Sequence, residues 1–295
     1  MERKKASDFP PEVLKLFDGY VHGGISRREF LESAGRYAAG GFSAAAMLQA
    51  LSPNFAWAQQ VKPDDKRIVA EYVAYLAPKG SGKMRGYLAR PAAARGKLSA
   101  VVVIHENRGL NPYIEDVARR LATVGYLAFA PDALSPVGGY PGNEDQAREM
   151  FAKLDGPKRT EDLVAAVDYV RLRPDANGKV GAIGFCFGGG MVNTIATRVP
   201  DLAAAVPYYG AQPAAAEAAK INAPMLLHYA GVDDRINAGW PAFEEVLKAH
   251  HVKYQAHSYP GTQHGFHNDT TPRYDEAAAK LSWERTLAFF KAHLG

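Results

Sequence analysis

The sequence predicts an α/β fold with a mostly parallel central sheet covered by helices on both faces, preceded by a segment of a different kind. From about residue 66 onward, apolar β-rich runs alternate with segments of helical periodicity, which is typical of a sheet with crossover helices. Residues 98–106 (LSAVVVIHE) form a continuous apolar run, as expected of a central strand buried on both faces. No repeat or low-complexity linker interrupts this part. We therefore expect one domain over 59–295 and a leader or helical arm over 1–58.

The domain is predicted to begin with a hairpin at a sheet edge. Residues 67–77 and 83–91 alternate polar and apolar side chains around the turn sequence PKGSGK. The central strand follows, and residues 111–125 then place apolar residues at helical spacing and end in a glycine, which indicates a helix. The next strand is expected over residues 126–132.

The second half of the domain continues the alternation after a long loop at 133–145. The loop leads into two helical segments, and the strand that follows them ends at the only cysteine in the chain. The remaining expected elements are helices at 146–155 and 158–174, strands at 178–185, 202–210, 223–231 and 253–261, and a closing amphipathic helix at 277–294.

Composition excludes some classes of function. The 295 residues are 47% hydrophobic, enough to bury a large core. The chain has 35 Lys and Arg and 31 Asp and Glu, which gives a formal net charge of +4. It has no dense basic run, so a nucleic-acid partner is not expected. A single cysteine excludes an intramolecular disulfide and a zinc site built from several cysteines.

The first sixty residues resemble a twin-arginine export leader. SRREFL at 26–31 is followed by an Ala/Gly-rich segment over 37–51 and by Ala56-Trp57-Ala58, so cleavage is expected after Ala58 and the protein is expected in the periplasm or exported. The apolar run is too short and too rich in small residues for a stable membrane span, which needs about 20 residues.

A retained helical arm is the alternative for the same segment. Five apolar residues upstream of the arginines lie at helical spacing among acidic residues, which is unusual for the basic front end of a leader. They are Val13, Leu14, Phe17, Tyr20 and Val21. Such an arm would pack on its own chain or join two chains as a homodimer, and the protein would then stay in the cytoplasm.

The cysteine lies in VGAIGFCFGGG, where an apolar strand turns sharply into a helix. Gly184 and Gly188 flank Cys186 and permit the close approach of strand and helix, because neither has a Cβ. The amides at the start of the helix favour a negative charge on the sulfur, and the thiolate is the nucleophilic form. A lone cysteine is more often a small buried apolar residue, but the elbow favours a nucleophile here.

A nucleophile on such a turn needs an acid and a histidine later in the chain, in that order. GVDDRI follows an apolar strand and supplies Asp233, and PGTQHGFHND supplies His264 in the loop after the last strand. Asp234 and His267 remain competitors for these roles, because spacing alone does not resolve a shift of one or three residues.

The HENRG sequence at 105–109 closes the central strand and is expected to help hold an oxyanion. The amides of Asn107 and Phe187 are the expected donors. Glu106 would oppose thiolate formation by its like charge, so we expect it to hold the thiol proton until substrate arrives. The alternative for Glu106 is a loop ion pair, for instance with Arg108.

With these residues assembled, the chain resembles the dienelactone hydrolase family of the α/β-hydrolase superfamily over residues 66–294. GFCFGGG, GVDDRI, PGTQHGFHND and the glutamate of HENRG carry the resemblance. It implies an α/β-hydrolase fold, a catalytic triad of Cys186, Asp233 and His264, and a carboxylate at Glu106 that engages the thiol and moves on substrate binding. The implied reaction is carboxymethylenebutenolidase-like hydrolysis of a small ester or lactone through a thioester acyl-enzyme.

Substrate recognition departs from the family pattern. Prototype members hold the substrate carboxylate with arginines, one a few residues after the histidine, whereas this chain reads HGFHNDTTPRYD there, with Asn268 near and Arg273 farther away. Dienelactone as substrate therefore does not follow. The weaker candidates for substrate contacts are Arg108, Tyr140 and His267.

The mechanism expected from these residues requires no metal and no organic cofactor, and its partner is a small ester or lactone. Two alternatives use the same cysteine. One is an acyltransferase that passes the acyl group to an acceptor other than water. The other is a non-catalytic thiol redox sensor, which would leave the spacing of Asp233 and His264 unexplained.

Overall fold

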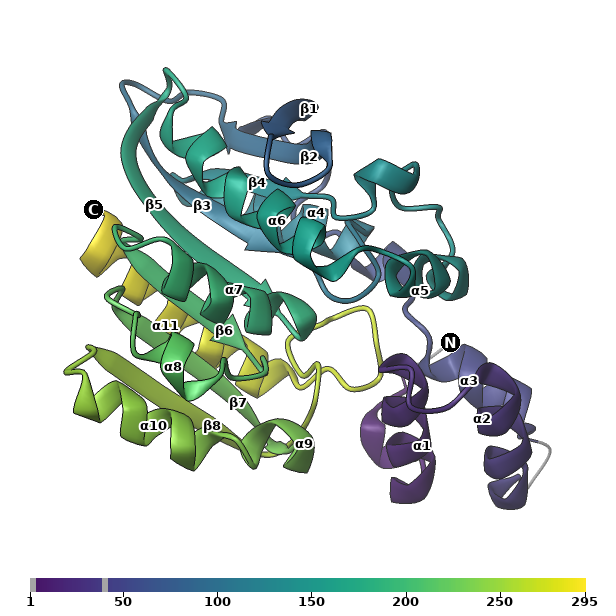
Figure 1. The fold of residues 1–295 in the computed structure, drawn as a ribbon. Helices are drawn as coiled ribbons and strands as arrows, with labels where there is room; N and C mark the ends of the chain where they lie inside the picture. The colour runs from purple at the N-terminus through teal and green to yellow at the C-terminus, as the bar shows by residue number, and fades with distance from the viewer. Residues whose placement is uncertain (1–3, 39–41) are drawn as a thin grey trace.

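The sheet at the centre of the molecule has eight strands, in the order β1-β2-β4-β3-β5-β6-β7-β8 (Figure 1), in a computed structural model that describes residues 4–38 and 42–295. Strand β2 runs opposite to its neighbours β1 and β4, and the other neighbouring strands are parallel. The predicted edge hairpin and mostly parallel sheet are confirmed. The strands are β1 (Ile68–Ala77), β2 (Gly82–Pro91), β3 (Leu98–Ile104), β4 (Leu127–Pro131), β5 (Ala176–Phe185), β6 (Ala204–Tyr208), β7 (Met225–Val232) and β8 (Tyr254–Gln263).

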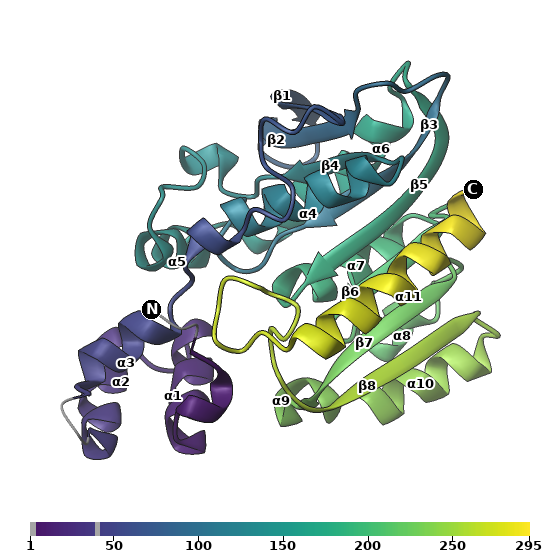
Figure 2. The same cartoon turned by 180° about the vertical axis from the view of Figure 1, so that it is seen from behind.

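Helices cover both faces of the sheet. Figure 2 shows α4 (Pro112–Thr123) and α11 (Glu276–Leu294) on one face. The opposite face carries α6 (Gly156–Arg171), α7 (Phe187–Arg198), α8 (Ala215–Ala218) and α10 (Trp240–Ala249). Two further helices, α5 (Glu144–Ala152) and α9 (Asp234–Asn237), follow the carboxyl ends of strands.

The alternation of side chains along β3 explains why both faces need a cover. Val101 and Val103 pack into the core beneath α4 and α11, whereas Val102 and Ile104 pack into the core beneath α6 and α7. All four side chains are fully buried. Successive residues of a strand point to opposite faces, so a continuous apolar run requires apolar layers on both sides.

The N-terminal segment forms a helical lobe with its own small core. It comprises α1 (Pro11–Val21), α2 (Arg27–Ala34) and α3 (Ala44–Leu51). Helix α2 begins with a capping box in which Ser26 accepts from the amide of Glu29 and the Glu29 side chain accepts from the amide of Ser26. The lobe lies beside the loop that follows β8 (Figure 1). The helical spacing noted upstream of the arginines is therefore that of a real helix, α1.

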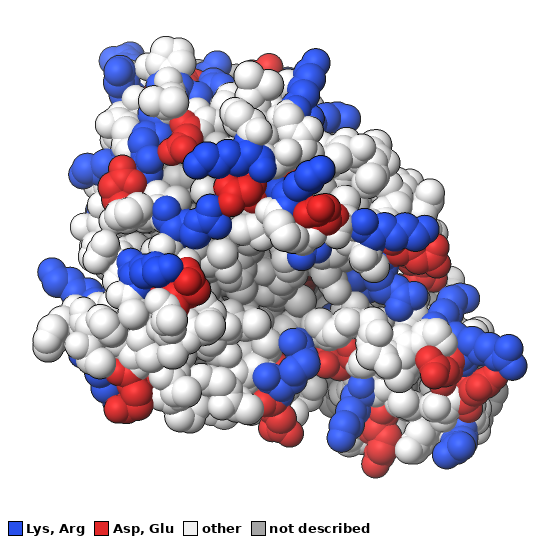
Figure 3. Space-filling view, viewed as in Figure 1, with Lys and Arg blue, Asp and Glu red and all other residues white. Residues whose placement is uncertain are grey.

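The outer surface mixes both signs of charge. Acidic and basic side chains alternate over the face seen in Figure 3, which is hollowed near its centre. Within the described residues, no helix has the length and apolar character needed to cross a bilayer.

Candidate active site

Cys186 lies on a strained corner between β5 and α7. Its backbone has φ 56° and ψ −115°, in the left-handed half of conformational space that side chains disfavour. The corner depends on two close approaches. A Cβ on Gly188 would lie 2.2 Å from the carbonyl oxygen of Ile104, and one on Gly184 would lie 2.2 Å from the carbonyl oxygen of Gly188. Only glycine fits at these two positions, and the tight packing holds the sulfur at the carboxyl end of the sheet.

Asp233 and His264 meet at the same end of the sheet. Asp233 follows β7 and His264 follows β8, the neighbouring strand, and Nδ1 of His264 lies 2.6 Å from Oδ2 of Asp233. The Nε2 atom of His264 is buried and has no hydrogen-bond partner among the described residues. It lies within 4.8 Å of the Cys186 sulfur. The structure thus brings the three predicted triad residues together.

The two competing residues lie elsewhere. Asp234 is exposed and begins α9. His267 is buried, and its Nδ1 lies 2.7 Å from the hydroxyl of Tyr113. Neither side chain belongs to the cluster around the sulfur.

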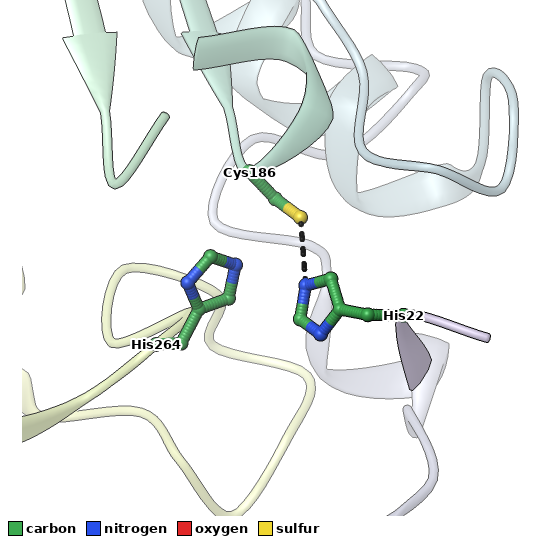
Figure 4. A group of neighbouring side chains, drawn as sticks. All are labelled: His22, Cys186 and His264. Atoms are coloured by element: carbon green, nitrogen blue, oxygen red, sulfur yellow. Dashed lines mark hydrogen bonds between the residues drawn. The ribbon is translucent and has the colours of Figure 1, made fainter. Parts of the chain in front are cut away.

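His22 is a member of the cluster that the sequence reasoning missed. It caps the end of α1, and its Nε2 lies 3.4 Å from the Cys186 sulfur, as the dashed line in Figure 4 shows. Its Nδ1 lies 2.8 Å from the carbonyl oxygen and 3.2 Å from Oδ1 of Asp18. Nothing in the local sequence marks His22, because the contact joins residues 164 positions apart.

The sulfur and the two imidazoles influence each other's pKa. Burial alone would raise the pKa of the Cys186 thiol, but the charges of His264 and His22 hold it well below its usual range. Burial would lower the pKa of His22, yet the Cys186 charge and the hydrogen bond to Asp18 raise it to about 10. The pKa of His264 is also raised, against burial, by Cys186 and Asp233. The arrangement favours a thiolate beside an imidazolium.

Glu106 lies near the sulfur, but its hydrogen bond is to Asn268. The Asn268 amide donates to Oε2 of Glu106 over 2.9 Å. Burial first, and the Cys186 charge second, raise the pKa of Glu106 to about 7, although Arg273 and His264 oppose the shift. The alternative pairing of Glu106 with Arg108 is not observed.

Arg108 faces the N-terminal lobe instead. Its Nε lies 3.8 Å from Glu144, and its guanidinium donates to the carbonyl oxygen of Val21 over 3.3 Å. The side chain of Asn107 donates to the same carbonyl oxygen over 2.9 Å. The loop at 105–109 therefore serves as a docking point for α1 as well as a border of the site.

Two spaces open at the sulfur. The larger has a volume of about 420 Å³, and the smaller, about 50 Å³, lies beneath the N-terminal lobe. Cys186, His264 and Asn107 line both, whereas Phe187 lines the larger and Arg108 the smaller. Other residues of the larger space are His22, Met191, Gln212, Pro213, Arg235 and Ile236.

Tyr140 and His267 are not among the residues that line these two spaces. The hydroxyl of Tyr140 donates to Glu144 over 2.8 Å, and its ring packs against Phe55 with centroids 6.3 Å apart. The expectation that Tyr140 and His267 contact substrate thus has no geometric support in this conformation. The loop at 133–145 contacts the N-terminal lobe, since Asp145 accepts a hydrogen bond from the hydroxyl of Tyr20.

The cluster also has the donor atoms of a metal site. Among residues 4–38 and 42–295, His22, Cys186 and His264 bring two imidazole nitrogens and a sulfur within 4.8 Å of one another. Nitrogen and sulfur donors suit zinc, but Nε2 of His22 and the sulfur contact each other at 3.4 Å, so we do not assign these residues as metal ligands. The expectation of a metal-free mechanism stays a prediction.

Comparison with known proteins identifies relatives of both parts of the chain. A family model described as dienelactone hydrolase family matches residues 84–294, and one described as YqhI-like matches residues 1–39. A putative hydrolase fragment, YghX, of Escherichia coli K12 is 59% identical over 113 residues, which are 38% of this chain and 97% of that protein.

Longer matches cover most of the chain. A putative carboxymethylenebutenolidase of Escherichia coli O157:H7 is 32% identical over 251 residues, covering 80% of this chain and 91% of that protein. The crystal structure of a putative dienelactone hydrolase from Klebsiella pneumoniae has 29% sequence identity and a TM-score of 0.67, and the match covers 76% of this chain and 99% of that one.

Proposed function

Because the chain belongs to the dienelactone hydrolase family and is a hydrolase of esters or lactones, we propose that it works through a Cys186-His264-Asp233 triad and a thioester intermediate. The Cys186 thiolate attacks the carbonyl carbon, a C–S bond forms, and the carbonyl electrons move to oxygen. The backbone amides of Phe187 and Asn107 hold that oxyanion. The C–O bond then breaks, and the leaving oxygen takes a proton from the His264 imidazolium.

Water completes the turnover. His264, oriented by Asp233, removes a proton from a water molecule, and the oxygen attacks the thioester carbonyl. The C–S bond breaks as the acid leaves, and the electron pair returns to sulfur. A lactone yields a single hydroxy acid, because its alcohol and acyl groups are joined.

The observation that carries this proposal is the orientation of His264. Its Nδ1 is held by Asp233 at 2.6 Å, which directs the unpartnered Nε2 toward the sulfur and the 420 Å³ space. A space of this size takes a small molecule rather than a polymer segment. A small ester or lactone is therefore the proposed substrate class, in line with the carboxymethylenebutenolidase names of the relatives.

Substitution of the sulfur tests the proposal. Cys186→Ala is expected to abolish turnover of p-nitrophenyl acetate and of small lactones, while circular dichroism and the melting temperature stay close to those of the unsubstituted chain. The control is His250→Gln, a change at an exposed position after α10, which is expected to keep the activity of the unsubstituted chain. Unchanged activity of Cys186→Ala in a clean preparation would refute the triad.

Two experiments distinguish the hydrolase from an acyltransferase and from a redox sensor. An acyltransferase would give a new ester or amide when an alcohol or amine acceptor is added, and product analysis by mass spectrometry detects it. A redox sensor would show peroxide-dependent modification of Cys186 without ester turnover.

For residues 1–58 we retain the export proposal. Arg27 and Arg28 are both exposed on α2 and open to recognition by a translocation machinery. N-terminal sequencing of periplasmic material is expected to begin at Gln59, whereas an intact N-terminus on cytoplasmic protein supports the retained arm. Homodimerisation through this segment is a separate proposal, and light scattering of the purified chain tests it.

A further inference from the structure

The N-terminal lobe is attached to the hydrolase domain through the two residues that precede His22. The carbonyl oxygen of Tyr20 accepts from Arg148 over 3.0 Å, and its hydroxyl donates to Asp145. The next carbonyl, that of Val21, accepts from Asn107 over 2.9 Å. These contacts fix the end of α1, so the position of the His22 ring is set by the docking of the helix rather than by the flexibility of a chain end.

The ring of His22 is also oriented. Its Nδ1 faces the carbonyl oxygen and the carboxylate of Asp18, one turn earlier in α1, so this nitrogen carries a proton and Nε2 is directed at the sulfur. Asp18 is in turn 3.7 Å from the Nη1 atom of Arg273. Burial disfavours a charged Asp18, yet its hydrogen bond with His22 and the charges of His22, His264 and Arg273 hold the pKa of this carboxyl well below its usual range. A charged Asp18 stabilises a charged His22.

We propose that, in the chain that keeps residues 1–58, His22 is a catalytic residue that takes the proton of the Cys186 thiol and remains beside the sulfur as its counter-ion. The S–H bond breaks, an N–H bond forms at Nε2 of His22, and the electron pair stays on sulfur. The inference rests on the proposed function, which it deepens by dividing the work between two imidazoles. In acylation the leaving oxygen then takes this proton from His22 instead of from His264. Nε2 of His264 therefore stays free for the proton of water in deacylation.

The charged neighbours of His22 have opposing effects on its protonation. Asp18 and the thiolate favour its protonation, whereas His264 and Arg235 oppose it. Nη2 of Arg235 lies 3.1 Å from the same Nε2. Arg235 is an exposed residue, so its guanidinium can turn into solvent at little cost when Nε2 is protonated. Its loss should therefore strengthen the ion pair, opposite to the loss of Asp18.

Alkylation of the thiol tests the proposal directly. The chain has one cysteine, so the rate of its modification by iodoacetamide as a function of pH gives the pKa of Cys186 without any substrate. His22→Gln is expected to raise that pKa by at least one unit and to slow alkylation at pH 6 by about tenfold. Asp18→Asn should shift it in the same direction by less, and Arg235→Ala in the opposite direction.

Two further variants separate the ion pair from a structural effect. His22→Gly leaves space for a ring, and added imidazole is expected to restore part of the alkylation rate. His250→Gln changes an exposed histidine on the far end of α10 and should reproduce the unsubstituted profile. If His22→Gln does not fold, as judged by circular dichroism, the opposite shifts of Asp18→Asn and Arg235→Ala carry the test.

Each result decides the matter. Alkylation profiles of His22→Gln and the unsubstituted chain that superimpose would overturn the role of His22. A shifted profile together with an absence of ester turnover would overturn the proposed function and leave the thiolate–imidazolium pair standing.

Discussion

The two imidazoles beside the sulfur are alike in orientation but differ in how the fold holds them. His264 and His22 each turn Nδ1 toward an acidic residue and Nε2 toward Cys186. His264 follows a strand of the sheet, and its partner Asp233 follows the neighbouring strand. His22 comes from a helical lobe whose core, around Phe17 and Phe30, is separate from that of the sheet. His264 is thus held by the loop at the end of a sheet strand, whereas His22 is brought to the site by a lobe that docks onto the domain.

The difference in attachment predicts a difference in stability. The attachments of the lobe around His22 are hydrogen bonds and partly exposed ion pairs, and an exposed ion pair contributes only about 0–1 kcal/mol. Regions with few buried apolar contacts to the rest of a protein open at a lower free energy than its core strands. The lobe that carries His22 should therefore unfold or detach at a lower free energy than the sheet that positions Cys186, Asp233 and His264.

Removal of the sheet-held imidazole should have the largest effect. His264→Gln is expected to lower kcat/KM for an activated ester by about 10³-fold or more, because loss of a triad histidine removes the base for water. Steady-state kinetics measure it, with His250→Gln as the control. A loss below tenfold would show that His22 can replace His264.

The elbow should be the next most sensitive feature. Gly188→Ala places a methyl group 2.2 Å from a backbone oxygen, and we expect a loss of at least about 3 kcal/mol in the free energy of unfolding, measured in urea. Gly35→Ala is the matched control in the N-terminal lobe. Gly35 has a right-handed helical backbone and no atom within 4 Å of its added Cβ, so this change should be neutral or slightly stabilising. Equal losses would contradict the packing argument.

Glu106 should make stability depend on pH. Its pKa is raised from 4.5 to about 7 in the folded chain, so the folded chain binds this proton more tightly than the unfolded chain does. The free energy of unfolding should therefore fall as the pH rises from 4.5 to 7, by up to about 3 kcal/mol. Urea titrations of Glu106→Gln over the same range are expected to lack this decline. A parallel decline in both proteins would assign it to other groups.

The smallest expected effect is on the docked lobe alone. Arg148→Ala removes the donor to the carbonyl oxygen of Tyr20 and a guanidinium that lies 4.3 Å from the centre of the Tyr20 ring. We expect hydrogen exchange in α1 to quicken about tenfold, a change of roughly 1–2 kcal/mol, without change in β3 or β5. Arg171→Ala, which removes ion pairs to two largely exposed aspartates, is the control. Equal acceleration in sheet and lobe would show that the two open together.

The same contrast explains what the sequence could predict. The elbow at Cys186 follows from neighbouring residues and local steric limits, and Asp233 and His264 follow from the order of strands, whose carboxyl ends meet at one edge. His22 was missed because its position depends on the docking of one helix onto a distant surface. Tyr140 was expected near substrate, but its ring packs against Phe55 of the N-terminal segment, a contact that no local pattern indicates.

The location of His22 upstream of Ala58 links processing to reactivity. If the leader is removed, the mature enzyme loses the His22 imidazole beside Cys186, whereas the precursor keeps both His22 and His264 there. The two forms would then differ in their sensitivity to thiol-directed inhibitors, and an electrophile chosen for one would spare the other.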